Sequence, residues 1–159
     1  PTVTGHIFGG CNTSGDVDGM TRVVLAGGTV AGNVYGGGNQ ANITKGNTQV
    51  LVLGGTVNGS VYGGGLGETG QAKGPTKDTD VYVLDDRLTA DGLLELNAGK
   101  TTFNFESASA DRHAWQCLPL QVKKADGSVL RTPVTIKGNV FGGGQQGTVT
   151  GETHVQIGS

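Results

Sequence analysis

Short runs of alternating polar and apolar residues recur along the chain and predict β-strands rather than helices. In residues 48–52, T-Q-V-L-V, Val50 and Val52 fall on one side of an extended chain and Gln49 on the other, because side chains alternate with a period of two. The same T-x-V-x-[VIL] pattern is found at residues 21–25, 48–52, 79–83 and 153–157. We therefore expect related strands that each turn one apolar face toward a core.

A second β-type pattern, T-V-x-G-x-[VI]-[YF], has a central glycine at which the chain can bend, and it ends in a glycine run. Its copies read G-H-I-F-G-G-C from Gly5, G-N-V-Y-G-G-G from Gly32, G-S-V-Y-G-G-G from Gly59 and G-N-V-F-G-G-G from Gly138. The starts at 5, 32 and 59 give a period of 27, and the step from 59 to 138 is 79, which is 27 plus 52 further residues. A phosphate-binding glycine loop would occur once, so the repetition favours a structural role for these glycines.

A fixed period of this size is typical of a solenoid, a propeller or an array, in which each unit buries its apolar face against its neighbours. Short strands joined by glycine, without helices, favour an all-β fold: a parallel β-solenoid with coils of about 27 residues, stacked about 4.8 Å apart. A propeller is the alternative, although its blades need four strands in roughly 40–50 residues. We expect Gly37 and Gly64 to occupy stacked corners with positive φ, where a Cβ would clash.

Composition narrows the class of protein further. Glycine occupies 31 of 159 positions without the every-third-residue spacing of collagen. A net charge of −2 and recurring Val, Ile and Leu argue against disorder, and the near-neutral chain lacks the basic footprint of nucleic-acid binding. Its apolar runs are far shorter than the roughly 18 residues that span a membrane. The first residues lack the features of a signal peptide, so we expect a cytosolic chain or an already processed piece.

The repeat unit G-N-V-Y-G-G-G-N…T-x-V-x-V-x-G-G-T-V resembles the glycine-rich repeats of large secreted or cell-surface proteins of gut bacteria, which are similar to adhesin-type β-solenoids. The resemblance covers residues 1–85 and 133–159. It implies an extracellular or cell-surface setting, and it brings no catalytic residue and no cofactor.

Residues 86–132 interrupt the repeat and predict a small antiparallel insertion. Residues 120–123 and 129–131 flank Asp126-Gly127, a favoured pair for a tight hairpin turn, and residues 102–106 alternate as a strand does. The insertion also contains aromatic and charged side chains of the kind that recognise ligands. The candidate ligand-binding residues are Phe105, Arg112, His113 and Trp115; an alternative interpretation makes the last three a half-buried anchor for the insertion.

The repeats align side chains into columns. An aromatic column would bind sugars if it were an exposed stripe, whereas an internal ladder would only stabilise the stack. Threonine columns suggest an ice-binding face. The alternation with apolar residues turns at least one of these columns toward the core, which disfavours ice binding. The aromatic column comprises Phe8, Tyr35, Tyr62 and Phe141, and the threonine columns comprise Thr29, Thr56 and Thr135 and, separately, Thr21, Thr48 and Thr79.

Other polar residues give weaker signals. The segment Asp16-Val17-Asp18-Gly19 resembles the start of a calcium loop, but the later ligands are missing and a solvated turn is favoured. His6 and His154 fall at positions where other coils carry varied polar residues, which indicates surface decoration. Cys11 replaces the third glycine of its run, and a bond to Cys117 would close a loop of about 100 residues and stabilise the fold by up to roughly 4–5 kcal/mol. Whether the two cysteines pair stays open.

These features favour a non-enzymatic structural and interaction module without metal or cofactor. We expect a stalk segment of a bacterial surface adhesin, whose insertion recognises a surface glycan or protein, with no nucleic-acid partner and no membrane insertion. One alternative is a carbohydrate-active β-helix enzyme of the polysaccharide lyase or hydrolase kind, which would gather acidic and basic side chains on one face beside the insertion. Another is a filament subunit that self-associates end to end, because bare terminal coils expose unpaired strand edges.

Overall fold

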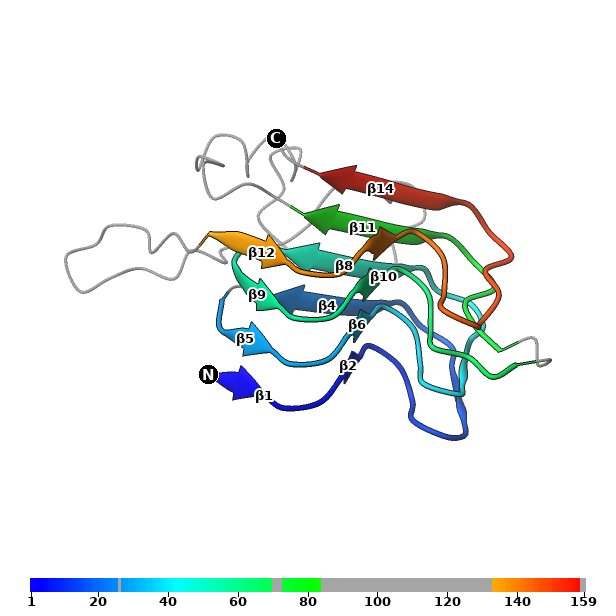
Figure 1. Cartoon of the computed structure of the whole chain (residues 1–159). Coiled ribbons are helices and arrows are strands. Elements are labelled where there is room, and N and C mark those ends of the chain that lie inside the picture. The colour runs from blue at the N-terminus through cyan, green and yellow to red at the C-terminus, as the bar shows by residue number, and fades with distance from the viewer. Residues whose placement is uncertain (26, 70–72, 84–132, 158–159) are drawn as a thin grey trace.

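The computed structural model describes residues 1–25, 27–69, 73–83 and 133–157, and these residues form β-strands and connecting loops. The strands stack in successive coils from the N-terminus toward the C-terminus (Figure 1). The fold is an all-β parallel β-solenoid, as the repeat predicts, and the stack is not closed on itself. In the described part of the chain, no helix is long and apolar enough to cross a membrane.

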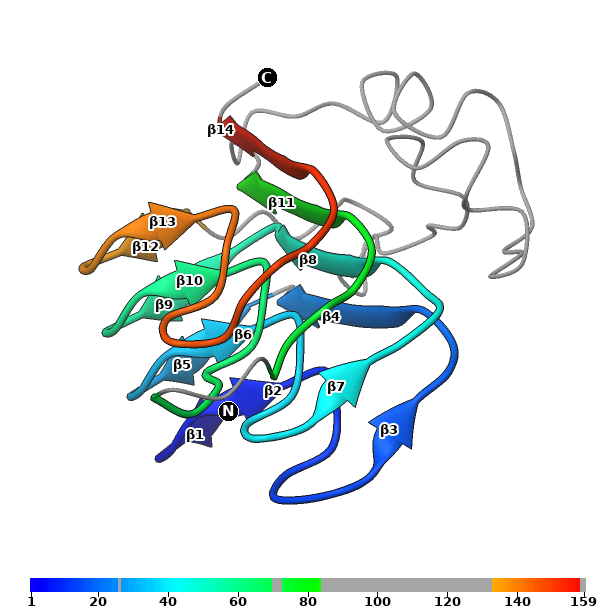
Figure 2. The same cartoon turned by 90° about the vertical axis from the view of Figure 1, so that its right-hand side faces the viewer.

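Three parallel sheets run along the described stack, and each takes one strand from every coil (Figure 2). The first contains β1 (Thr2–Val3), β5 (Thr29–Val30), β9 (Gly55–Val57) and β12 (Val134–Ile136). The second contains β2 (Ile7–Phe8), β6 (Val34–Tyr35), β10 (Val61–Tyr62) and β13 (Val140–Phe141). The third contains the longest strands, β4 (Thr21–Leu25), β8 (Thr48–Val52), β11 (Thr79–Val83) and β14 (Thr153–Ile157).

A short fourth sheet pairs β3 (Asp16–Val17) with β7 (Asn42–Ile43) in the loops that connect the second and third sheets. The sequence pattern predicts a solvated turn at Asp16–Gly19, and this prediction is wrong for the first two residues. Ile43 is fully buried and also bridges to Pro75 of the following coil. The connecting loops therefore stack in register too.

The register of the strands confirms the repeat and shows one irregularity. In the first sheet Thr2 pairs with Thr29, Thr29 with Thr56 and Thr56 with Thr135, so equivalent threonines lie side by side in all of the coils. The extra residues between Thr56 and Thr135 therefore leave the stack unbroken. In the third sheet, Thr48 pairs with Thr79 and not with the residue one period later. The loop before β11 is thus longer than the period predicts.

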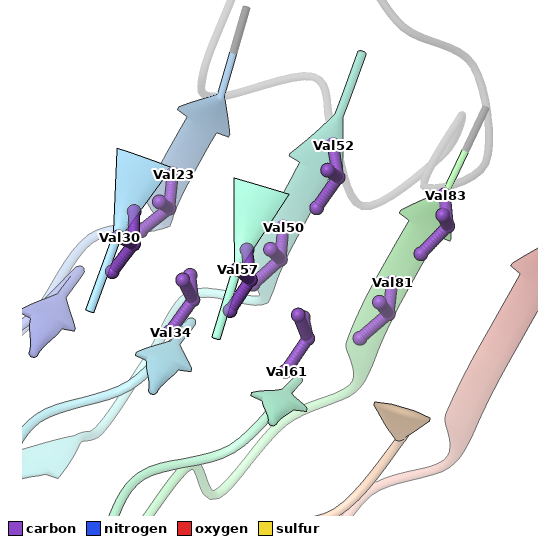
Figure 3. Close-up of a cluster of buried hydrophobic side chains, with 9 residues drawn as sticks. All are labelled: Val23, Val30, Val34, Val50, Val52, Val57, Val61, Val81 and Val83. Carbon is purple, nitrogen blue, oxygen red and sulfur yellow. The ribbon is translucent and has the colours of Figure 1, made fainter. Parts of the chain in front are cut away.

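Valine fills the interior of the solenoid (Figure 3). Valine suits this place because its branched side chain packs well on a pleated sheet, and identical residues stack on one another from coil to coil. Fully burying each such side chain stabilises the fold by about 1.5–3 kcal/mol. The cluster comprises Val23, Val30, Val34, Val50, Val52, Val57, Val61, Val81 and Val83.

Glycine is required at the corners formed by Gly37 and Gly64 because the coils stack closely there, not because of the backbone conformation. A Cβ built on Gly37 would lie 2.9 Å from the amide nitrogen of Gly65, and one on Gly64 would lie 2.7 Å from that of Gly144. The prediction that Gly37 and Gly64 sit at stacked corners is confirmed, but the prediction of positive φ there is wrong. In the described residues, the glycines with positive φ are Gly15, Gly28, Gly55 and Gly67.

Candidate functional site

One threonine column points into the solenoid and binds the glycine corners. The hydroxyl of Thr21 donates to the carbonyl oxygen of Gly36, 2.6 Å away, and Thr48 donates in the same way to Gly63. Each hydroxyl thus satisfies a buried carbonyl of the following coil. Thr21, Thr48 and Thr79 are buried, so this column offers no face to ice.

The aromatic column is a continuous stack. The ring centroids of Phe8 and Tyr35 are 4.8 Å apart with 5° between the ring planes, and those of Tyr35 and Tyr62 are 4.9 Å apart at 8°. Tyr62 and Phe141 continue the stack at 4.9 Å and 13°. Because the rings cover one another's faces, Tyr35 is only 1% exposed, and the middle of the ladder has no free ring face for a sugar.

The hydroxyl of Tyr35 is held at the edge of this stack. It donates to Oε1 of Gln145 at 2.6 Å and accepts from Nδ2 of Asn33 at 2.8 Å. Burial raises the pKa of Tyr35, which the hydrogen bond from Asn33 partly offsets. Tyr35 therefore contacts three other coils, two through its neighbours in the stack and the last one through Gln145.

His6 lies on the surface, as predicted, and it also belongs to a polar ladder that joins the coils. Its Nδ1 accepts a hydrogen bond of 2.8 Å from the backbone amide of Asn33. The Asn33 side chain accepts from the amide of Ser60 at 2.8 Å, and the Ser60 hydroxyl accepts from the amide of Asn139 at 3.0 Å. In the first three repeats, the side chain after the first glycine thus satisfies the next coil's amide.

The acidic segment near β3 is joined to the next coil rather than open to a cation. The Asp18 carboxylate accepts from Nζ of Lys45 at 2.7 Å and from the hydroxyl of Thr44 at 2.6 Å. The hydrogen bond from Lys45 lowers the pKa of Asp18, and Thr44 adds to this effect. Asp16 accepts from Asn42. Across the described ranges, no three His, Cys, Asp or Glu residues are grouped to hold a metal ion.

The chemically richest cluster lies on the third sheet, and we call it the polar column: Arg22, Gln49, Asp80 and His154, paired in register across β4, β8, β11 and β14. Arg22 donates through Nε at 3.0 Å and through Nη2 at 2.6 Å to Oε1 of Gln49. The ring of His154 lies 5.6 Å from that of Tyr82 and is half-buried, so the prediction of surface decoration is wrong for this histidine, in contrast to His6.

Burial limits what the polar column can do. Gln49 points away from the valine core, as predicted, yet it is 1% exposed, and Asp80 is 0% exposed. A carboxylate so deeply buried does not reach a polysaccharide in this structure. The column does place an acid and a base on one face near the start of the insertion, as the enzyme alternative requires, but its acid is enclosed. The variable second position of T-x-V-x-[VIL] was the sequence signal for this column.

Comparison of the chain with family models, with curated proteins and with solved structures finds no match.

The predicted ligand-binding residues, Phe105, Arg112, His113 and Trp115, lie outside the described residues, as do the predicted hairpin and Cys117. Their roles stay predictions, and so do the boundaries of the insertion. Cys11 is half-buried and forms no disulfide with any residue that the structure describes, so its pairing with Cys117 also stays a prediction.

Proposed function

We propose that this chain is a non-enzymatic structural and interaction module, a stalk segment of a cell-surface protein of the adhesin type. One observation supports the stalk most directly: the repeated side chains are used in contacts between coils. Threonine hydroxyls bind glycine carbonyls, aromatic rings stack on aromatic rings, and His6 and its counterparts bind the next amide. Such columns stabilise a rod and leave recognition to other parts of the chain.

Recognition belongs, in this proposal, to residues 86–132. Repeat proteins accept an insertion within one coil because each coil contacts only its neighbours, and such insertions often form the binding face. The strands on either side, β11 and β12, keep their register with the preceding coil. The insertion brings Arg112 and Trp115, residue types that dominate binding hot spots, and the expected ligand is a surface glycan or protein.

A glycan array tests this proposal with three proteins. The intact chain binds a subset of glycans, a variant in which a Gly-Asn turn replaces residues 86–132 binds none, and Trp115→Ala binds more weakly. Phe141→Ala is the matched control, since it removes an exposed aromatic ring from the coils, and it leaves binding unchanged. Circular dichroism of the deletion variant should stay β-rich. A deletion variant with unchanged affinity would place the site on the coils instead.

A further inference from the structure

The third sheet buries both of its faces. In β8 and β11 every residue is buried, although side chains alternate between the two sides of a strand. Val50 and Val81 belong to the valine interior, so the residues next to them in the strands point to the outer side. These outward residues are exposed by 1% or less: Gln49, Leu51, Asp80 and Tyr82. On the first sheet, by contrast, the outward Thr56 keeps part of its surface exposed.

Two rows of side chains make up the outer face of the third sheet. One row is the polar column. The other row is apolar at its centre, where Leu51 pairs in register with Val24 on one side and with Tyr82 on the other. Leu51 is fully buried and yet is not part of the valine cluster. A leucine and a tyrosine on the outside of a solenoid would lie against water unless other side chains packed on them.

The strands of the described coils lie elsewhere. The first and second sheets are on the inner side of the third sheet, where Val30, Val34 and Val50 meet (Figure 3). The strands β3 and β7 belong to the loops that lead into β4 and β8. The exposed fractions are those of a single copy of the chain, so neither a second copy nor another protein accounts for the burial. The layer over this face therefore belongs to the same chain.

The insertion has the position and the length to form this layer. It begins at residue 86, close behind Val83, the last residue of β11. The other ranges outside the described residues are too short to cover two strands: 26, 70–72 and 158–159. Of these segments, only residues 86–132 are long enough to pack across β8 and β11.

The composition of the insertion also matches the two rows. Leu93, Leu94 and Leu96 are apolar side chains of the kind that pack on Leu51 and its neighbours. The insertion contains acidic and basic residues as well, and a buried polar row needs polar or charged partners. A segment of this composition can lie against both rows at once.

We propose that the insertion packs on the outer face of the third sheet and forms a second layer over β8 and β11. Its apolar side chains lie against Leu51 and Tyr82, and its polar side chains lie against the polar column. The base of the insertion is thus fixed to the stack, and its remaining surface faces outward. The packing does not depend on what the insertion binds.

Cross-linking in the intact chain tests the proposal directly. Replacing Tyr82 by p-azidophenylalanine keeps an aromatic ring on the outer face, and irradiation bonds this ring to the nearest side chain. Mass spectrometry of the digested protein should find the cross-link on a peptide from residues 86–132. The matched control has the same replacement at Phe8 on the second sheet, and it should give no cross-link to that segment.

Thiol labelling is a second test, in a chain that also carries Cys11→Ser and Cys117→Ser. In the intact chain, Leu51→Cys should react with a maleimide at least about a hundredfold more slowly than Asn58→Cys, because labelling requires the packed layer to open. When a Gly-Asn turn replaces residues 86–132, Leu51→Cys should react nearly as fast as Asn58→Cys, which is exposed in the coils.

Val50→Cys is the control within the same strand. It faces the valine interior and should stay protected with or without the insertion. The proposal would be overturned if Leu51→Cys reacted as fast as Asn58→Cys in the intact chain, or if it were equally protected in both proteins. A cross-link from residue 82 that reached only another coil would overturn it too. Neither experiment uses a glycan, so this packing and the proposed recognition can fail separately.

Discussion

One side-chain carbon decides whether two coils can stack at a glycine corner. At Gly64 a Cβ would lie 2.7 Å from the nitrogen and 2.9 Å from the Cα of Gly144, and both are backbone atoms that cannot rotate away. Gly64→Val should therefore lower the free energy of unfolding by more than about 1 kcal/mol. Gln40→Val, at a half-buried loop position, is the control and should change it by less than about 0.5 kcal/mol. Equal melting temperatures for the two variants would show that the corner is not tightly packed.

The raised pKa of Tyr35 makes stability depend on alkaline pH. Burial favours the neutral phenol in the folded protein, whereas the unfolded tyrosine ionises near its ordinary pKa of 10.0. The contribution to stability is complete below that pH and is lost as the pH rises through the higher folded pKa. In urea unfolding at about pH 8 and about pH 11, the unmodified chain should lose more stability than Tyr35→Phe. The same loss in both proteins would mean that Tyr35 ionises equally well in the folded state.

At the scale of elements, the aromatic ladder joins the coils of the second sheet. Tyr35 has a ring on each face and is buried, so Tyr35→Ala leaves a gap in the stack and should lower the free energy of unfolding by about 3–5 kcal/mol. Phe141→Ala removes the same kind of ring from the open end, where only one face is covered, and should lower it by less than about 1.5 kcal/mol. Similar losses, measured in urea at low protein concentration, would show that stacking does not stabilise the ladder.

Repetition is what made the elements predictable. Once the period places Thr48 beside Thr21, the strands, their register and the inward valines follow from alternation. The strand β3 was missed because two residues are too few to show a period and Asp-x-Asp-Gly is typical of turns. Glycine at residue 37 fits either a positive φ or a close approach, and the sequence alone does not separate these two causes.

The polar side chains that join the coils are visible in the sequence, but their contacts are not evident from single positions. The residues of the polar column vary from coil to coil, which favours a solvated surface when each is considered alone. In register, Arg22 lies over Gln49 and forms hydrogen bonds with it. A change of residue type from one coil to the next thus brings together two side chains that bind each other. His6 likewise looks isolated until the amide of Asn33 is placed next to it. Side-chain ladders between coils are recognised by comparing columns rather than single positions.

At the scale of the whole molecule, the described structure is a stack of coils joined by parallel sheets. Columns of equivalent side chains run along the axis of this stack and join each coil to the next. The positions of the residues proposed for recognition could not be predicted from the sequence, because Arg112 and Trp115 belong to no column. Both also lie outside the described residues. Periodicity gives the position of a residue that repeats and gives none for a residue that occurs once.

The solenoid continues in register across the extra residues between the third and the last coil. Ala31, Asn58 and Lys137 are exposed and hold equivalent places in consecutive coils, with the amide of Asn58 donating to the carbonyl of Val30 at 2.8 Å and that of Lys137 donating to Val57 at 2.9 Å.

Nitroxide labels on cysteines at these three sites, in a chain that also carries Cys11→Ser and Cys117→Ser, report the distance between coils by dipolar broadening. Adjacent coils should place the labelled backbones about 5 Å apart, and a Thr4–Asn58 pair, two coils apart, about 10 Å.

The decisive measurement is the broadening in the Asn58–Lys137 pair, whose members lie on opposite sides of the insertion in the sequence. The in-register solenoid predicts broadening as strong as in the Ala31–Asn58 pair, whose members are a single period apart, and stronger than in the Thr4–Asn58 pair. Spectra of the Asn58–Lys137 pair without dipolar broadening would show that the coils on the two sides of the insertion do not stack, and would contradict the account.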